Sequence, residues 1–412
     1  MTNKLSISNN NNPFNAIVVV AALGYFVDIY DLILFGIVRN PSLQDLNFVG
    51  TEITNKGLFL LNCQMFGMLI GGVLWGVLGD IKGRVSVLFG SIIMYSAANI
   101  ANGFVTDFDT YAFLRFIAGV GLAGELGAGI TLVSETMSKE SRGWGTMIIA
   151  TFGALGAVLA SVVGDMFTWR IAYFVGGGLG LLLLLLRFAT YESGMFEQVK
   201  QSVIRRGAFQ TLFTNTIKFK KYIACIAVGL PVWFTVGILI ILSPEFGKEM
   251  QVQGTVSAGK AIMWCYLGLS IGDLLSGYLS QKLKSRKQAV ILFLIFTLVG
   301  YILFMIASGI SLTNFLGLCF LLGFGTGYWA LFVTISSEQF GTNIRATVTT
   351  TVPNFVRGSL LPISAAFAYL KNVLPMMHAA MLVGFICLLS AFIAIIYLPE
   401  TFGKDLDYIE EE

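Results

Sequence analysis

The stretch Gly76-Val77-Leu78-Gly79-Asp80-Ile81-Lys82-Gly83-Arg84-Val85-Ser86 is a short polar segment between two long apolar runs. The runs cover roughly Gly57–Leu78 and Val85–Ala101, and each is long enough to cross most of a bilayer. An acid, two bases and turn-forming glycines between such runs indicate a tight connection at one face of a membrane.

Apolar runs of this kind recur along the whole chain. Charged residues make up 12% of the sequence, against about a quarter in ordinary globular domains. Runs of about twenty apolar residues predict membrane-spanning helices, so we expect an integral membrane protein. The expected spans are approximately 14–38, 57–79, 85–103, 111–135, 144–166, 170–187, 222–242, 258–279, 288–307, 315–336, 347–369 and 377–397.

The polar segment has a second copy later in the chain. Gly277-Tyr-Leu-Ser-Gln281-Lys282-Leu-Lys284-Ser-Arg286-Lys287 begins 201 residues after Gly76. A second signature also returns, 203 residues on: Ser134-Glu135 with Arg142-Gly143 is matched by Ser337-Glu338 with Arg345-Ala346. Two motifs with nearly one offset indicate a duplicated half, which is the parallel repeat of two six-helix bundles.

The repeat predicts how the chain is divided. The expected parts are a disordered N-terminal tail over 1–13, an N-terminal six-helix bundle over 14–187, a cytoplasmic linker over 188–221, a C-terminal six-helix bundle over 222–397 and a cytoplasmic C-terminal tail over 398–412. The expected fold class is therefore an all-α membrane protein with twelve transmembrane helices in two bundles.

The polar segment resembles the loop between helices 2 and 3 of the major facilitator superfamily. That motif reads Gly, three residues, an acid, a base, any residue, Gly, any residue and two bases. Gly76, Asp80, Gly83 and the nearby Arg84 match it, whereas Ile81, Val85 and Ser86 depart from it and Gln281 replaces the acid in the second copy. The resemblance implies a cytoplasmic gate of charged residues that holds the outward-open state. Its expected members are Gly76, Asp80, Gly83, Arg84, Glu135 and Arg142, with Arg286, Glu338 and Arg345 as a partial copy.

Further matches narrow the resemblance to a group within that family. The first helix, over Gly24–Gly36, and the fourth, over Arg115–Glu125, are similar to those of metabolite:proton symporters, and the first also to that of phosphate:proton symporters. Trp169-Arg170 with Glu192-Ser193 and Phe196 resembles the signature that flanks helix 6 in metabolite symporters, and Pro399-Glu400-Thr401 with Gly403 resembles the end of helix 12 in sugar porters. Together these matches cover both halves of the chain.

The distribution of basic residues predicts the orientation. If the N-terminus is cytoplasmic, the cytoplasmic segments hold eighteen Lys and Arg residues and the outer segments hold six. This bias obeys the positive-inside rule, so we expect an inner-membrane protein with both termini in the cytoplasm. The basic linker is expected to lie on anionic lipid rather than to bind nucleic acid.

Several functional classes have no support in the sequence. Gly119, Gly121 and Gly124 form a GxGxxG, but it lies inside an apolar helix, where small residues allow close helix packing. The chain has no P-loop sequence, and its five cysteines occur singly inside apolar spans. We therefore expect no nucleotide, no other cofactor, no metal and no enzymatic activity.

Six ionisable residues fall inside the expected spans: Asp28, Asp31, Arg115, Glu125, Asp273 and Arg357. Each charge costs about 2.5–3.5 kcal/mol at a helix centre on insertion scales, so these residues need partners, water or protonation. At about 1.5 Å per residue, Asp31 and Arg115 come out at similar depth, and we expect them to pair. Asp28 and Glu125 then remain as proton carriers, and the four N-terminal residues form the expected proton-coupling site.

The remaining polar candidates are assigned by depth. Arg357 comes out near the midplane, where it is expected to be unpaired and to bind the substrate together with Tyr30. Asp273 lies four residues before Gly277, so we expect a gate contact from it. His378 begins the last span and is expected to be interfacial rather than a proton relay.

The predicted function is proton-coupled uptake of a small organic anion or zwitterion by alternating access, carried out by a monomer. A midplane guanidinium suits a carboxylate or a phosphate. Three alternatives remain open at this point: inorganic phosphate symport, favoured by Asp28-x-Tyr30-Asp31, proton-driven export of a drug or metabolite, and a non-transporting nutrient sensor on the same fold.

Overall fold

The computed structural model describes residues 16–82, 84–136, 142–191 and 211–403. Every regular element among these residues is a helix, and the one isolated β-bridge described joins Gln253 and Ser311 in two loops. The predicted all-α class is confirmed. The expected tail over 1–13 lies outside the described residues, as do most of the linker and the end of the C-terminal tail.

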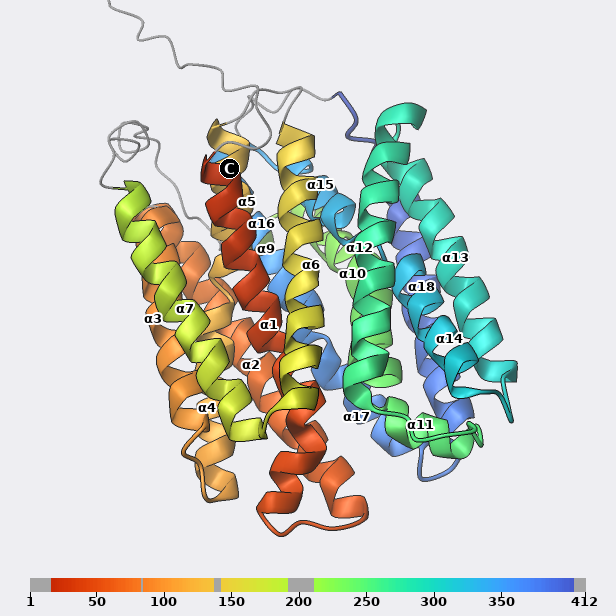
Figure 1. Ribbon diagram of the computed structural model, residues 1–412. Helices are drawn as coiled ribbons and strands as arrows, with labels where there is room; N and C mark the ends of the chain where they lie inside the picture. The colour runs from red at the N-terminus through yellow and green to blue at the C-terminus, as the bar shows by residue number, and fades with distance from the viewer. Residues whose placement is uncertain (1–15, 83, 137–141, 192–210, 404–412) are drawn as a thin grey trace, which may run out of the picture.

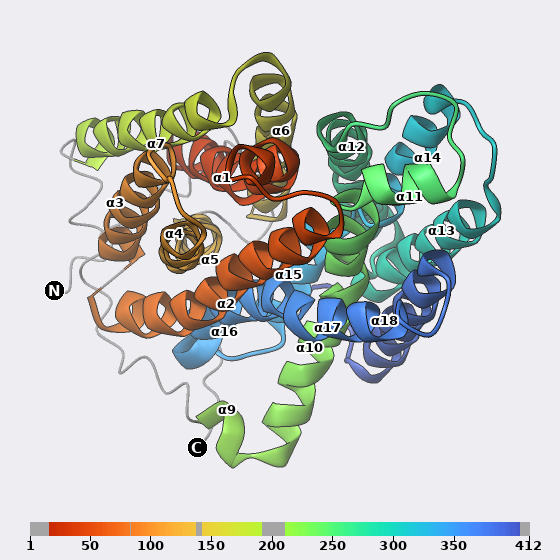
Figure 2. The same ribbon diagram turned by 90° about the horizontal axis from the view of Figure 1, so that it is seen from below.

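The helices of the first half of the chain are α1 (Ala16–Asp45), α2 (Thr51–Lys82), α3 (Arg84–Asn102), α4 (Phe108–Leu122), α5 (Glu125–Thr136), α6 (Arg142–Met166) and α7 (Trp169–Tyr191). In Figure 2 they occupy one side of the molecule, with α16 beside α2. In the first half of the chain, α1 packs most extensively against α6.

The helices of the second half follow a short segment, α9 (Thr211–Thr214). They are α10 (Thr216–Phe234), the π-helix η1 (Thr235–Ile240), α11 (Ser243–Glu249), α12 (Ala258–Leu283), α13 (Arg286–Ile306), α14 (Leu312–Gly325), α15 (Trp329–Glu338), α16 (Thr342–Gly358), α17 (Leu360–Leu370) and α18 (Met376–Tyr397). Residues 216–221 were expected to belong to the linker, but they form the start of α10.

The long helices run side by side through the molecule (Figure 1). Ten described segments are long and apolar enough to cross a membrane, and Ser86–Asn102 is a shorter apolar helix. The pair α16–α17 supplies a twelfth crossing, which agrees with the twelve predicted helices. We call the side on which α1 begins and α18 ends the terminal side, at the top of Figure 1, and the opposite side the distal side.

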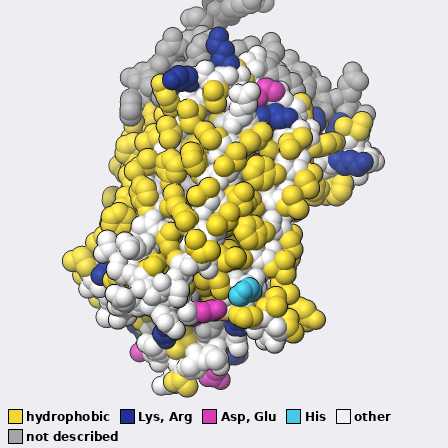
Figure 3. All heavy atoms as spheres, turned by 90° about the vertical axis from the view of Figure 1, so that its right-hand side faces the viewer, with side chains coloured by type: hydrophobic (Ala, Val, Ile, Leu, Met, Phe, Trp, Pro, Cys, Tyr) yellow, Lys and Arg dark blue, Asp and Glu magenta, His cyan; other side chains and the backbone are white. Residues whose placement is uncertain are grey.

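The outer surface of the bundle is apolar. Leu, Ile, Val and Phe side chains are exposed along most of the helices. Figure 3 shows them covering the middle of one face, while the charged side chains gather toward the two ends. Apolar side chains are compatible with the hydrocarbon core of a bilayer, and the charged side chains at the two ends would then lie at the two membrane–water interfaces.

Polar residues set the starts of several helices. Asp107 accepts a hydrogen bond from the Thr110 amide at 2.8 Å and begins α4. Ser285 and Ser311 cap α13 and α14 through the amides three residues further on. These caps satisfy amides that have no partner inside the helix, which explains why the polar loops predicted most of the helix ends.

Four predicted spans contain irregularities that were not expected. The fourth span breaks between α4 and α5, the tenth between α14 and α15, and the eleventh at Ser359 between α16 and α17. In the seventh span, Pro231 precedes the π-helix η1. A proline has no amide hydrogen to donate, and π-helical turns are frequent near functional sites. These irregular segments are therefore where we look for the functional site.

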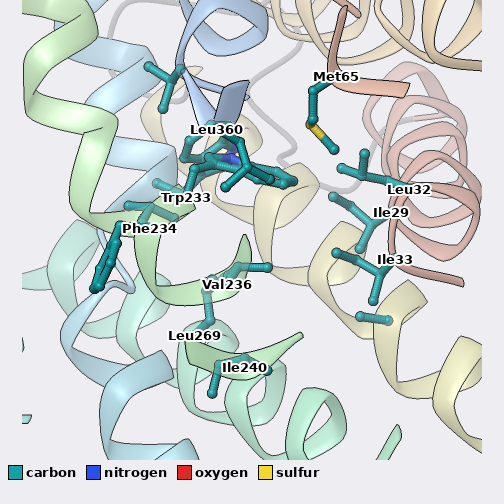
Figure 4. Packing of buried hydrophobic residues seen from close by; sticks show 14 of the residues in the cluster. Ile29, Leu32, Ile33, Met65, Trp233, Phe234, Val236, Ile240, Leu269 and Leu360 are labelled. Atoms are coloured by element: carbon teal, nitrogen blue, oxygen red, sulfur yellow. The ribbon is translucent and has the colours of Figure 1, made fainter. Parts of the chain in front are cut away.

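The two sets of helices meet along two lines. One line joins α2 to α16, and the other joins α6 to α12. Between these lines, Ile29, Leu32 and Ile33 of α1 face Trp233, Val236 and Leu269 of the second half, as Figure 4 shows. The core therefore continues across the junction, and polar groups placed there are cut off from both water and lipid.

Candidate functional site

A central cavity lies at this junction. Its lining side chains come from α1 and α6 of the first half and from α10, η1, α12, α15 and α16 of the second. The space open to water is about 20 Å³, which is room for about one water molecule. An organic substrate does not fit into a space of this size.

Arg357 of α16 is the basic residue of the cavity lining. Its Nη2 atom lies 3.4 Å from Asp28 Oδ2 on α1, and both side chains are almost completely buried. Its guanidinium carbon lies 6.0 Å from the ring centre of Trp233 and 5.9 Å from that of Trp329. The expectation of an unpaired Arg357 was wrong, because its partner lies on the other half of the chain, where spacing along one helix cannot find it.

The cavity also holds polar atoms whose hydrogen-bonding capacity is unused. Within the described part of the chain, Arg357 Nε, Asp273 Oδ2 and Trp329 Nε1 of the lining have no hydrogen-bond partner, and neither does Oδ1 of Asp28, the partner of Arg357. Leaving a buried polar atom unpaired costs about 1–3 kcal/mol, so such atoms commonly serve a ligand or an ordered water. The cavity thus offers both donors and acceptors to a bound molecule.

Asp273 is placed differently from its expected position. It lines the central cavity together with Arg357, and its Oδ1 atom accepts a hydrogen bond from the Ala330 amide at 3.0 Å. That amide belongs to the first turn of α15, directly after the break in the tenth span. The gate contact predicted for Asp273 is therefore corrected to a position beside the candidate binding site.

Tyr30 also lies elsewhere. Its hydroxyl donates to the Ala172 carbonyl oxygen of α7 at 2.9 Å, and the side chain is completely buried within the first half. Tyr25, one turn and a half earlier on α1, lines the cavity in its place. The tyrosine expected to touch the substrate is therefore Tyr25 rather than Tyr30.

Asp31 and Arg115 are near each other but form no hydrogen-bonded pair. Arg115 donates to Asn99 Oδ1 at 3.0 Å and to Gln64 Oε1 at 3.4 Å. It still acts electrostatically on Asp31, to which Asn99 also lies close, and neither oxygen of Asp31 has a partner at normal hydrogen-bond geometry among the described residues. The predicted proximity holds, but two uncharged side chains on α2 and α3 are the direct partners.

Glu125 has a partner that was not predicted. Arg187 of α7 donates to both of its carboxylate oxygens, and the Nη1–Oε2 distance is 3.2 Å. Both side chains are buried. Arg187 is the last residue of the sixth expected span, so the sequence placed it at the end of the bundle, whereas the helix continues to Tyr191.

The candidate gate lies at the terminal side. Gly76 of α2 lies beside α16, and a Cβ atom on it would be in ordinary van der Waals contact with Thr351 Cγ2 at 3.6 Å. In the second half, Arg286 binds both oxygens of Glu338 at 3.0 Å, while Arg345 Nε donates to the Ser337 carbonyl oxygen at 3.1 Å. Gly83 lies outside the described residues, as do the side chains of Asp80, Arg84, Glu135 and Arg142.

Glu400 completes the second-half copy of the gate. It accepts hydrogen bonds from the Ser285 hydroxyl and from the amides of Arg286 and Lys287 at the start of α13. Partial burial raises the pKa of this carboxyl, but the hydrogen bonds to Ser285 and to the Phe402, Arg286 and Lys287 amides lower it further, so the net pKa is below its usual value. A carboxylate that receives several donors is most stable in its charged form.

A second contact between the halves lies at the distal side. Arg39 of α1, which is only 1% exposed, donates to Glu245 of α11 at 2.6 Å. Thr54 of α2 donates to the same carboxylate oxygen at 3.3 Å. The sequence placed both charged residues in or near outer loops, and no motif marked them. The available signal was their position: Arg39 and Glu245 each lie just after the end of an expected span, and both spans end on the same side of the membrane.

His378 is exposed in the first turn of α18 at the distal end, as expected of an interfacial residue. Among the described residues, no group of three or more His, Cys, Asp or Glu side chains could hold a metal ion. The described cysteines are all free.

Comparison with known proteins agrees with this architecture. The model of the Major Facilitator Superfamily matches residues 21–363. A probable 4-methylmuconolactone transporter of Cupriavidus pinatubonensis is 27% identical over 94% of this chain and 91% of its own length. The 3-(3-hydroxy-phenyl)propionate transporter of Escherichia coli is 27% identical over 70% of this chain and 71% of its own.

The solved structure of the proton:xylose symporter XylE shares the fold. It superposes with a TM-score of 0.71 at 16% sequence identity and covers 97% of this chain and 98% of its own. The relatives are transporters rather than enzymes, and the family model covers most of the chain. This protein therefore belongs to the Major Facilitator Superfamily of multi-pass membrane transporters.

Proposed function

We propose that the protein is a proton-coupled symporter that takes up small organic anions, with the carboxylate of the substrate bound by Arg357. The single observation that carries this proposal is the buried Arg357–Asp28 pair at the central cavity, with Trp233 and Trp329 beside the guanidinium. The Arg357 guanidinium has the Asp28 carboxylate as its partner, and a substrate carboxylate can compete with Asp28 for the guanidinium.

The chemistry of the lining favours an organic acid. A guanidinium binds a carboxylate through two parallel hydrogen bonds, and tryptophan faces accommodate flat apolar groups. Tyr25, Tyr266 and Leu269 add further apolar surface. Inorganic phosphate would expose its remaining oxygens to these apolar walls, so the lining supports the organic anion over the phosphate alternative.

Competition for Arg357 provides a means of coupling. When Asp28 takes up a proton, it loses the charge that holds Arg357, and the guanidinium becomes free for the substrate carboxylate. When the substrate leaves, Asp28 gives up its proton and the internal pair forms again. Because the pair joins α1 to α16, this exchange also changes the strength of contact between the two halves.

The remaining parts of the proposal follow the predicted topology. We propose that residues 14–187 and 222–397 form two bundles that rock about the central cavity, with 188–221 as the linker. The positive-inside bias supports cytoplasmic termini, so the terminal side faces the cytoplasm and the distal side faces outward. The central cavity lies within one chain, which supports a monomer as the working unit.

The relatives support the substrate class. One is named for 4-methylmuconolactone and another for 3-(3-hydroxy-phenyl)propionate, and both names describe small organic compounds. The second contains a carboxylate and an aromatic ring, the two groups that Arg357 and the tryptophans would bind.

The test is uptake into proteoliposomes with and without an inward proton gradient. The panel contains 3-(3-hydroxyphenyl)propionate, nicotinate, 4-methylmuconolactone and phosphate, with xylose and nicotinamide as uncharged controls. We expect gradient-dependent accumulation of an organic acid and none of phosphate or the uncharged compounds. Equal uptake of nicotinate and nicotinamide, or accumulation without a gradient, would contradict the proposal.

A further inference from the structure

Asp273 of α12 is a buried carboxylate of the central cavity that has no part in the function proposed so far. It is 0% exposed and lines the cavity together with Arg357. Arg357 has Asp28 as its partner, whereas Asp273 is in none of the ion pairs among the described residues. A buried carboxylate without a cation beside it is costly, so its other contacts have to offset that cost.

The start of α15 holds one oxygen of this carboxylate. Asp273 Oδ1 accepts from the amide of Ala330, the second residue of α15, at 3.0 Å. The first amides of a helix have no partner within the helix and carry a partial positive charge. They stabilise the ionised form of Asp273 against burial, and an ionised carboxylate accepts hydrogen bonds but cannot donate them.

Close packing keeps Asp273 at the start of α15. A Cβ atom on Gly327, in the break before α15, would lie 2.5 Å from Gly272 Cα and 2.8 Å from the Asp273 amide nitrogen. The backbone of the break therefore touches the backbone of α12, and no side chain separates them. Leu269, one turn before Asp273 on the same face of α12, lines the same cavity.

Two polar atoms beside this contact are left without a partner. In the part of the chain that the structure describes, Asp273 Oδ2 and Trp329 Nε1 have no partner at normal hydrogen-bond geometry, although Tyr25 lies close to Trp329. Both residues line the cavity, and Trp329 directly precedes the Ala330 whose amide binds Asp273. The cavity thus presents an acceptor and a donor at the same turn of α15, because an indole N–H can only donate.

A hydroxyl group satisfies both atoms at once. It has one hydrogen to donate to Asp273 Oδ2 and lone pairs that can accept from Trp329 Nε1. An ether oxygen has no hydrogen to offer the carboxylate, and an ammonium group cannot accept from the indole. The two atoms together therefore favour a hydroxyl over these other substituents.

Trp329 also connects this part of the cavity to Arg357. The guanidinium carbon of Arg357 lies 5.9 Å from the centre of the Trp329 ring. A molecule whose carboxylate binds Arg357 can therefore extend along the indole toward Asp273. The cavity has one binding point for a carboxylate and a second for another polar group of the same molecule.

We propose that Asp273 and Trp329 determine which organic acids the protein accepts, by binding a hydroxyl group that the substrate carries in addition to its carboxylate. Asp273 Oδ2 accepts the hydroxyl hydrogen, and Trp329 Nε1 donates to the hydroxyl oxygen. The inference rests on the binding of the carboxylate by Arg357 proposed above, and it adds the selectivity of the site. A site built to hydrogen-bond a hydroxyl rejects the analogue that lacks it, because its buried polar groups are then left unpaired.

The first test varies the ligand and leaves the protein unchanged. Calorimetry in detergent measures the affinity of the wild type for 3-phenylpropionate, for its ortho, meta and para ring-hydroxylated forms, and for the methoxy derivative of the tightest of these. We expect the best hydroxy acid to bind at least tenfold more tightly than both the unsubstituted and the methoxy acid. Equal affinities, or tighter binding of the methoxy acid, overturn the inference.

The second test exchanges an acceptor for a donor. In Asp273→Asn the side-chain oxygen must face the Ala330 amide, so the NH₂ group takes the place of Oδ2. We expect the preference for the hydroxy acid over the methoxy acid to fall at least tenfold, while the affinity for 3-phenylpropionate changes by no more than a few fold. Trp329→Phe keeps an aromatic ring without the N–H, and it should weaken binding of the hydroxy acid more than that of 3-phenylpropionate.

The control is Ser270→Ala on the same helix. Ser270 is also buried, but its hydroxyl donates to the Tyr266 carbonyl oxygen at 2.9 Å and it does not line the cavity. This variant should keep the wild-type order of affinities.

The outcomes separate this inference from the proposed function. An equal loss for all three acids in Asp273→Asn or Trp329→Phe shows a structural role, and an unchanged preference shows no role; either result overturns the inference. Binding of none of these acids by the wild type also overturns it, while the uptake panel decides the symporter proposal separately. Selective binding without gradient-dependent uptake supports the hydroxyl site and contradicts symport. If Asp273→Asn does not fold, the comparison of ligands on the wild type decides.

Discussion

Arg357 is the residue on which substrate binding is expected to depend most. Lysine keeps the positive charge but lacks the flat, two-pronged donor that matches a carboxylate. We expect Arg357→Lys to weaken binding of the transported acid by about 1.5–3 kcal/mol, the usual contribution of a hydrogen bond to a charged group. Calorimetry in detergent measures this change, with an unchanged thermal midpoint as the check on folding. Unaltered affinity in a folded variant would falsify the anchor role.

Asp28 is expected to matter for both stability and coupling. Replacing it with asparagine leaves the Arg357 guanidinium buried without its anion, which is strongly destabilising. A bound organic acid supplies the missing charge, so we expect substrate to raise the thermal midpoint of Asp28→Asn more than that of the wild type. Accumulation under a proton gradient should be lost while exchange persists.

The control for this substitution is Asp109→Asn, which makes the same chemical change at an exposed position in the first turn of α4. It should behave like the wild type in both assays. If Asp28→Asn accumulates substrate normally, proton coupling does not pass through the Arg357 pair.

At the scale of the helices, the contact between Glu400 and the start of α13 links α18 to its neighbour. Glu400 accepts from the first two amides of α13, beside the amide that Ser285 caps, so we expect Glu400→Ala to cost about 0.5–2 kcal/mol of stability at neutral pH. Because the pKa of Glu400 is lowered in the folded protein, this stabilisation is present above the unfolded pKa and is lost as the pH falls through the lower folded pKa.

Thermal midpoints of wild type and Glu400→Ala, measured from pH 7 downward, test the sign of this effect. The difference between them should shrink as the solution becomes acidic and vanish below the folded pKa. A difference that grows toward low pH contradicts the assignment.

The helices show which features the sequence could predict. Span ends follow from polar loops and caps such as Asp107, because an unpaired amide needs a local partner. The contact that follows the break before α15 was not predictable, since Asp273 of α12 accepts from the Ala330 amide across the fold. The candidate site was likewise only partly predictable from the sequence. Depth along a helix placed Asp31 near Arg115, but only the packing of helices shows that Asp28 faces Arg357.

At the scale of the whole molecule, Arg39 and Glu245 are expected to hold the distal side closed. They join the two halves there, with Arg39 almost completely buried. We expect Glu245→Gln to increase the population that is open on the distal side. Spin labels at exposed Phe104 and Val373 would report longer distances between the halves in this variant.

Glu249→Gln provides a matched control on the same short helix. Glu249 Oε1 accepts from the Met377 amide of α18, a contact within the second half. Its loss should leave the distance between the two labels unchanged. If both substitutions shift the distances equally, the effect belongs to α11 and not to the pair with Arg39.

Closure of the terminal side depends on a close approach between α5 and α16. A Cβ atom on Gly127 would lie 2.3 Å from Thr350 Oγ1 and 2.5 Å from Thr350 Cα, so any larger residue must push the two helices apart. We expect Gly127→Val to hold the protein open on the terminal side, because the steric conflict arises only when that side is closed. Substrate binding should survive, since Gly127 does not line the central cavity, but turnover should fall at least tenfold.

Two measurements check this expectation. Spin labels at exposed Ser86 and Leu283 should move apart on the terminal side, and uptake should fall while calorimetric affinity stays within a few fold. The control is Gly178→Val on α7, where an added Cβ meets nothing within 4 Å. The same change of residue at that position should leave distances and uptake unaltered. Normal turnover in Gly127→Val would mean that transport does not require α5 and α16 to come this close, and closure would then have to occur elsewhere along the junction.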